Sequence, residues 1–247
     1  INGGHSLTLI SGAGDIALQG AIGEDTAIAS LSVNATDGDD GDIEIANIGD
    51  ATGVGVSGTV SIGNSDTAEL KLDGTIYSTG DTTIYESAAG GNIKLTGVNV
   101  TVSTSADNLT FDNGDLVLSA DGTTTISTGS TGGNIQIDGK IDGTTGTGNG
   151  SEALVLSSGT GTTTVDGAIG SGTALTSITI GSAGTGAIEL DDIGDSTGVG
   201  ASGAVAVGNT ATATLTLDGT VYSTDSTQTY VAKAGQNIDI TDAATFT

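Results

Sequence analysis

The sequence contains no cysteine, proline, methionine, tryptophan or arginine, and one histidine among its 247 residues. Without cysteine the chain can form no disulfide and offers no thiolate to zinc or to catalysis. Thirty acidic residues face four lysines, which gives a formal net charge of −26. Because nucleic-acid phosphates bind basic surfaces, we expect no nucleic-acid partner. No apolar run reaches the ~20 residues of a membrane-spanning helix, so we expect no membrane insertion.

The chain is instead built from short apolar triplets in which two large apolar residues flank one other residue. Examples are residues 7–9, 43–45, 70–72, 93–95, 116–118, 135–137, 154–156, 215–217 and 238–240. This period-two alternation is typical of strands with one buried face. The joints between triplets hold turn-forming pairs such as Asp73-Gly74, Asp138-Gly139 and Asp218-Gly219. We therefore predict an all-β protein.

Two architectures suit short strands with regular turns: an antiparallel sandwich and a parallel β-helix. The phrase Gly-Asn-Ile-x-[Leu/Ile] at residues 91–95 and 133–137 sets a short rhythm within the chain. Three strands of this spacing make a turn of about 20 to 30 residues, as in a parallel β-helix. We predict a single elongated parallel β-helix, or β-solenoid, over residues 1–247, with about 9 to 11 turns.

A longer repeat is also present. Residues 48–79 return at 193–224 with 22 of 32 positions identical and an offset of 145. We expect repeat units over about residues 1–150 and 151–247, with a loop at 143–150 between them and the second unit incomplete. A chain that stops within a unit is expected to be a window on a longer array.

Comparison of the two copies separates positions expected to face inward from those expected to face outward. Ile76 becomes Val221, a mild change at a position expected to point inward. Lys71 becomes Thr216, so charge is discarded at a position expected to point outward. The fold therefore depends on its apolar core and its turn residues more than on these charges.

The Gly-Asn-Ile-x-Leu and Gly-Asp-Ile-x-Leu phrases, joined by Ser/Thr/Gly-rich segments, resemble the repeat regions of filamentous-haemagglutinin-like bacterial exoproteins of the two-partner secretion type. The resemblance covers nearly the whole chain, and its motifs are loose. It implies a right-handed parallel β-helix that is secreted or held at the bacterial cell surface and acts in adhesion and biofilm. The secretion domain of that family carries an Asn-Pro motif, whereas this sequence has no proline. Passengers of autotransporters are similar as well.

The densest acidic segment holds Asp37, Asp39, Asp40 and Asp42. Calcium prefers several oxygen ligands from a flexible loop that contains glycine, so this segment is a candidate calcium site. A solvated acidic turn is the competing interpretation, and the aligned residues 182–187 of the second copy contain no acid. We expect no cofactor to be required.

The composition gives little support to catalysis. A lyase acting on acidic sugars needs arginine or lysine near the substrate, and this chain has no arginine and only four lysines. Its one histidine, His5, lies near the start of the sequence. We therefore expect no enzyme.

The four tyrosines, Tyr77, Tyr85, Tyr222 and Tyr230, recur in pairs at the 145-residue offset. We expect them to serve the structure, although an aromatic ladder for a glycan partner is the alternative.

We expect a structural and adhesive segment of an extracellular bacterial filament, surface adhesin or biofilm matrix protein. Its turns would stack end to end through unpaired backbone, so that the chain associates with itself into a fibre. Host or cell-surface glycans are the other partners considered. The alternatives are a carbohydrate-binding or carbohydrate-active β-helix protein and a calcium-dependent surface binding module.

Overall fold

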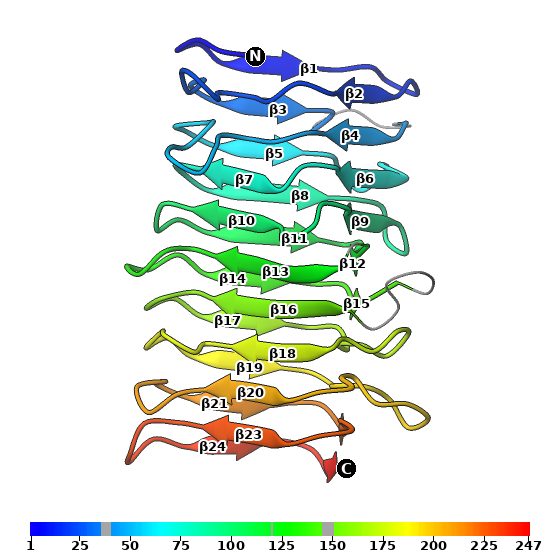
Figure 1. Cartoon of the computed structure of the whole chain (residues 1–247), viewed down its shortest axis with the longest axis vertical. Helices are drawn as coiled ribbons and strands as arrows, with labels where there is room; N and C mark the ends of the chain where they lie inside the picture. The colour runs from blue at the N-terminus through cyan, green and yellow to red at the C-terminus, as the bar shows by residue number, and fades with distance from the viewer. Residues whose placement is uncertain (36–40, 120, 145–150) are drawn as a thin grey trace.

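The computed structural model describes residues 1–35, 41–119, 121–144 and 151–247. These residues form strands and turns with no helix, so none of them belongs to a helix that could span a membrane. The strands stack as a parallel β-solenoid of about nine turns, with the N-terminus at the top of Figure 1 and the C-terminus at the bottom. The predicted all-β parallel β-helix is confirmed, and the antiparallel alternative is wrong.

Each turn of chain contributes to three parallel faces. Sheet A contains β1 (Leu7–Leu9), β3 (Leu31–Val33), β5 (Val60–Ile62), β8 (Thr83–Glu86), β11 (Leu109–Asp112), β14 (Ile135–Ile137), β17 (Thr163–Val165), β19 (Ile188–Leu190), β21 (Leu215–Leu217) and β24 (Ile238–Ile240). Sheet B contains β2 (Ile16–Leu18), β4 (Ile43–Ile45), β6 (Glu69–Leu72), β9 (Asn92–Leu95), β12 (Asp115–Leu118) and β15 (Ile141–Asp142), and single-residue bridges extend it to β22 (Val221–Tyr222) and β25 (Thr245–Phe246). Sheet C contains β7 (Ile76–Thr79), β10 (Thr101–Thr104), β13 (Gly122–Ser127), β16 (Glu152–Ser157), β18 (Ser177–Ile180), β20 (Val205–Gly208) and β23 (Gln228–Val231).

The apolar residues of the triplets form continuous inward columns. In sheet A the register pairs Leu7 with Leu31 at one end and Leu215 with Ile238 at the other, and successive partners lie 23 to 29 residues apart. The interior columns are buried, whereas the residue between two inward positions is partly exposed. Burial of each large aliphatic side chain contributes about 1.5–3 kcal/mol, so the columns are the main source of stability.

The polar corner residues bond one turn to the next. Asn47 Oδ1 accepts a hydrogen bond from the Thr75 N–H of the following turn at 2.7 Å. At the same place in the second copy, Asp192 Oδ1 accepts from the Thr220 N–H at 2.6 Å. A backbone donor that no sheet could satisfy is thereby paired. This requirement explains why Asx residues recur at the corners.

The 145-residue unit does not contain a whole number of turns. β4 lies on sheet B, whereas its counterpart one unit later, β19, lies on sheet A; likewise β5 of sheet A returns as β20 of sheet C. In sheet A, β19 lies six strands, and so six turns, beyond β3. β4 follows β3 by one face, which is a third of a turn. The step from β4 to its counterpart β19 is therefore five and two-thirds turns. Equivalent surfaces of the two copies therefore face directions a third of a turn apart.

Two loops show this rotation. Loop 49–55 and its copy, loop 194–200, extend on opposite sides of Figure 1. Each loop packs on the turn above through glycines: a Cβ on Gly23 would lie 1.9 Å from the Gly55 oxygen, and one on Gly170 would lie 2.1 Å from the Gly200 oxygen. No side chain fits there, which explains why these glycines are kept in both copies.

One expected inward position is wrong. Ile76 lies on the outer side of β7, partly exposed, and the following Tyr77 is fully buried; Val221 and Tyr222 repeat the arrangement. In this strand both neighbours are apolar, so alternation alone could not choose between them. The larger ring fills the interior, where Tyr85 stacks on Phe111 with ring centroids 5.4 Å apart.

Candidate functional site

The predicted calcium site falls largely outside the described residues. Asp37, Asp39 and Asp40 lie outside them, and Asp42 is described. The Asp42 N–H donates to Asp15 Oδ1 at 3.0 Å, so Asp42 belongs to a corner where one turn bonds to the next. Within the described ranges, no group of three or more histidine or acidic side chains is placed to hold a metal ion. Calcium binding at this segment stays a prediction.

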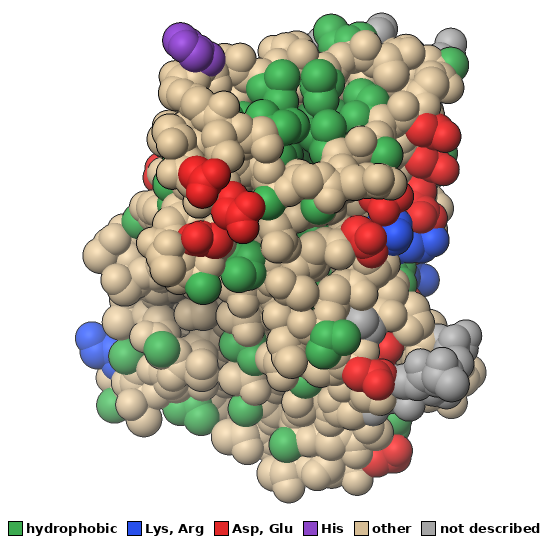
Figure 2. All heavy atoms as spheres, turned by 45° about the horizontal axis from the view of Figure 1, so that its top comes forward, with side chains coloured by type: hydrophobic (Ala, Val, Ile, Leu, Met, Phe, Trp, Pro, Cys, Tyr) green, Lys and Arg blue, Asp and Glu red, His purple; other side chains and the backbone are tan. Residues whose placement is uncertain are grey.

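An acidic cavity opens on sheet B beside Asp42. It has a volume of about 240 Å³, and its lining includes Asp15, Asp42, Glu44, Glu69 and Lys71. The lysine is held at one side by ion pairs, with Lys71 Nζ 3.4 Å from Glu44 Oε1 and 3.1 Å from Asp73 Oδ1. Acidic and basic side chains lie side by side along the right margin of Figure 2.

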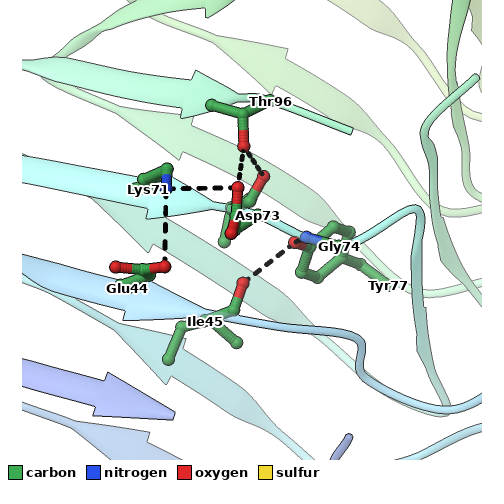
Figure 3. Close-up of polar contacts among 8 residues, drawn as sticks. Glu44, Ile45, Lys71, Asp73, Gly74, Tyr77 and Thr96 are labelled. Atoms are coloured by element: carbon green, nitrogen blue, oxygen red, sulfur yellow. Dashed lines mark hydrogen bonds and ion pairs between the residues drawn. The ribbon is translucent and has the colours of Figure 1, made fainter. Parts of the chain in front are cut away.

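Figure 3 shows how β4 and β6 place this charged group beside a buried tyrosine, Tyr77. The Thr96 hydroxyl and the Lys71 ammonium both donate to Asp73, and these bonds hold the pKa of the Asp73 carboxyl below its usual value. The hydrogen bond to Asp73 also raises the pKa of Lys71. Beside them, Tyr77 Oη donates to the Ile45 carbonyl at 3.0 Å.

The second copy of this group lacks the lysine. Glu189 and Asp218 stand where Glu44 and Asp73 stand, and Thr216 replaces Lys71. Without a cation between them the two carboxyls share a hydrogen bond, which together with burial raises the pKa of Glu189. The chain thus contains the same site with and without its cation.

A longer acidic feature follows the edge of sheet A. Six carboxylates occupy one register position in six successive turns, directly after the last inward residue of each strand; they are Glu86, Asp112, Asp138, Asp166, Asp191 and Asp218. We call this set the carboxylate column. Neighbouring turns of a β-sheet lie ~4.8 Å apart, so like charges are brought close together.

The column has measurable electrostatic consequences. Burial raises the pKa of Asp112 to about 6, with a hydrogen bond to Asp138 and the charge of Glu86 acting in the same direction. Burial and neighbouring carboxylates also raise the pKa of Asp191. One neutral side chain relieves the crowding, since Gln136 Nε2 donates to both Asp138 and Asp166 at 2.7 Å.

The sequence identified two of these acids, Asp138 and Asp218, as turn formers. Asp138 and Asp218 precede glycine, a pattern typical of turns. Their alignment into one column depends on the register between neighbouring strands. Because the turns vary from 23 to 29 residues, no fixed spacing in the sequence shows that alignment. The available signal was an acid directly after each second apolar residue of a triplet.

The structure also places the residues considered for catalysis and for aromatic binding. His5 is exposed in the first turn. Tyr77, Tyr85 and Tyr222 are fully buried, and Tyr230, in the last strand of sheet C, is partly buried. These tyrosines contribute to the core, as expected for a structural role, and the buried rings present no aromatic ladder to a glycan.

No known protein-family model matches the chain, and neither a curated protein nor a solved structure is significantly similar to it. The parallel β-solenoid is compatible with a β-helix repeat protein. Membership of the filamentous-haemagglutinin-like exoproteins therefore stays a proposal.

Proposed function

We propose that this chain is a segment of the shaft of an extracellular bacterial filament, surface adhesin or biofilm matrix protein, extended by end-to-end stacking of its turns. One observation carries the proposal: the inward columns run through the whole stack and are apolar at both ends. Leu7 and Leu9 begin two columns of sheet A, and Ile238 and Ile240 end them. Ile240 is 50 % exposed, whereas Leu217 one turn above it is 1 % exposed.

The two ends are complementary in shape because they belong to the same columns. A second copy stacked on the last turn would place its Leu7 and Leu9 against Ile238 and Ile240, continuing the parallel register. Phe246, 44 % exposed at the end of sheet B, would be covered as well. Hydrophobic side chains gather at the opposite, N-terminal end in Figure 2. Unpaired backbone at each outer turn supplies hydrogen bonds for such strand addition.

The charge distribution favours axial over lateral contact. The carboxylate column and the acids of sheet B lie on the sides of the rod, whereas the columns that end at its two tips are apolar. A net charge of −26 keeps neighbouring rods apart. Divalent cations such as calcium would weaken that repulsion, which is the role we propose for them in addition to the untested site at Asp37, Asp39, Asp40 and Asp42.

The extracellular location and the family assignment rest on the sequence. The Gly-Asn-Ile-x-Leu phrases and the absence of cysteine support a secreted exoprotein similar to the filamentous haemagglutinins. The solenoid is the fold that such a resemblance implies. We propose no catalytic role.

Sedimentation velocity of the purified chain over a range of concentrations tests the stacking. We expect the wild type to associate and Ile240→Lys, which places a charge in an end column, to remain a monomer. Val98→Lys is the matched control, because Val98 is also exposed (57 %) but lies on the side of the rod. Loss of association in both variants, or a wild type that stays monomeric, would contradict the proposal.

A further inference from the structure

Sheet C contains a hollow that the structural role does not explain. It has a volume of about 310 Å³ and lies between loop 49–55 and the outer faces of β7 and β10. Its lining residues are Asp50, Ala51, Ile76, Ser78, Thr101 and Ser103. The volume is at the lower end of the range for small-molecule sites.

The wall of the hollow is a turn held by several hydrogen bonds. Asp50 Oδ1 accepts hydrogen bonds from the Thr52 N–H at 2.7 Å, the Thr52 hydroxyl at 2.8 Å and the Gly53 N–H at 2.9 Å. These bonds lower the pKa of Asp50, so the carboxylate stays ionised. The loop is therefore fixed in place before any ligand arrives, which reduces the entropy lost on binding.

The floor of the hollow combines hydroxyls with one apolar side chain. Ser78 and Ser103 are paired in register on neighbouring strands, as are Ile76 and Thr101. Each hydroxyl can both donate and accept. Ile76 is the residue expected to point inward, and here it presents a branched aliphatic surface beside the hydroxyls.

The same set of residue types occurs in the second copy. Asp195, Ser196, Val221 and Ser223 lie 145 residues after their counterparts, and Asp195 makes the same three hydrogen bonds. Thr245 pairs with Val221 as Thr101 pairs with Ile76, and Thr247 bonds to Thr224 of the turn above. Thr245 and Thr247 lie outside the repeated stretch at residues 193–224, yet a Thr-x-Ser/Thr pair is present in both copies.

We propose that this hollow binds one residue of a neutral saccharide, and that the equivalent surface beside Asp195, facing a direction a third of a turn away, binds a second. Sugar hydroxyls would exchange hydrogen bonds with Ser78, Thr101 and Ser103, and a C–H face would lie on Ile76. Anionic sugars are repelled by the net charge of −26 in a chain with no arginine. Calcium would find a single carboxylate there, whereas it requires several oxygen ligands. Saccharide binding would give the proposed adhesive shaft a ligand. Its biological meaning rests on the proposed function, whereas the binding itself can be tested without it.

Saturation-transfer NMR with the intact chain tests the inference. The probes are maltohexaose, cellohexaose and mannohexaose, with hexagalacturonic acid as the anionic comparison. We expect at least one neutral hexasaccharide to bind and hexagalacturonic acid not to bind. Thr101→Tyr, which fills the hollow, should lower the signal, and Thr101→Tyr combined with Thr245→Tyr, which covers the equivalent surface, should abolish it.

Thr125→Tyr is the matched control, because Thr125 occupies the same outward column one turn below Thr101 and does not line the hollow. It should bind like the wild type, and circular dichroism should show all variants folded. Failure of every neutral probe, equal loss in the Thr125 variant, or preference for the anionic probe would overturn the inference. Sedimentation of the same samples reports stacking separately, so rods that associate but bind no saccharide refute this site and leave the proposed function intact.

Discussion

At the residue scale, two buried tyrosines on the consecutive strands β7 and β8 differ in what their hydroxyls do. Tyr77 Oη donates to the Ile45 carbonyl and accepts from the Gly74 N–H, and Tyr222 repeats both bonds with Leu190 and Gly219. Tyr85 Oη is buried with no hydrogen-bond partner among the described residues. The same phenol is therefore a link between turns in one place and an unsatisfied group in the other.

Phenylalanine substitutions should separate these roles. Tyr77→Phe leaves the partly buried Gly74 N–H and the buried Ile45 carbonyl without that partner, so we expect it to lower the free energy of unfolding by about 1–3 kcal/mol. Tyr85→Phe removes an unsatisfied hydroxyl and should be neutral or stabilising. Urea denaturation of the two variants checks the prediction, and equal destabilisation by both would contradict it.

A second residue-scale prediction uses the missing lysine. Thr216→Lys should place an ammonium between Glu189 and Asp218, as Lys71 lies between Glu44 and Asp73. The expected gain in unfolding free energy at pH 7 is at most about 1 kcal/mol, because exposed ion pairs are weak. NMR titration gives the sharper result: the pKa of Glu189 should fall in the variant, and an unchanged value would contradict this account.

At the scale of elements, the strand edge that carries the carboxylate column controls the dependence on pH. The pKa of Asp112 is about 6 in the folded protein against an ordinary value of 3.8, and those of Glu189 and Asp191 are raised as well. Groups with raised folded-state pKa values contribute stability below their ordinary pKa, and this contribution is lost as the pH rises through the folded value. Asp50, Asp73 and Asp195 have lowered pKa values and act oppositely, losing their contribution as the pH falls below 3.8.

We therefore predict that the free energy of unfolding decreases as the pH rises from about 4 to about 6. Asp112→Asn should reduce this slope and stabilise the protein at neutral pH. Asp225→Asn, at an exposed site outside the column, is the control and should leave the slope unchanged. Denaturation curves across this pH range test the prediction. A free energy of unfolding that increases with pH over the same interval would contradict it.

The elements were largely predictable, and the reasons for the exceptions are physical. Apolar triplets such as Ile43–Ile45 predict strands, because alternating apolar residues form one face that must be buried. The prediction of the inward face was wrong for Ile76–Thr79, because Ile76 and Tyr77 are both apolar and the pattern does not show which of them faces the core. The hollow beside loop 49–55 was missed because β7 and β10 contribute to it from turns 25 residues apart, and only the register shows that they are neighbours.

At the scale of the whole molecule, the repeat and the solenoid have different periods. The unit advances five and two-thirds turns, so equivalent surfaces return to the same side only after three units. The sequence revealed the 145-residue repeat, yet the rotation depends on turn lengths that the repeat does not specify. A longer array would present copies of loop 49–55 in three directions around one shaft.

The central claim is that the inward columns continue from one copy to the next. Cryo-electron microscopy of the purified chain at neutral pH tests it most directly. We predict rods longer than one chain, with an uninterrupted ~4.8 Å spacing and Leu9 of one copy packed on Ile240 of the copy before it. Separate rods the length of one chain, unchanged as the concentration is raised, would contradict the account.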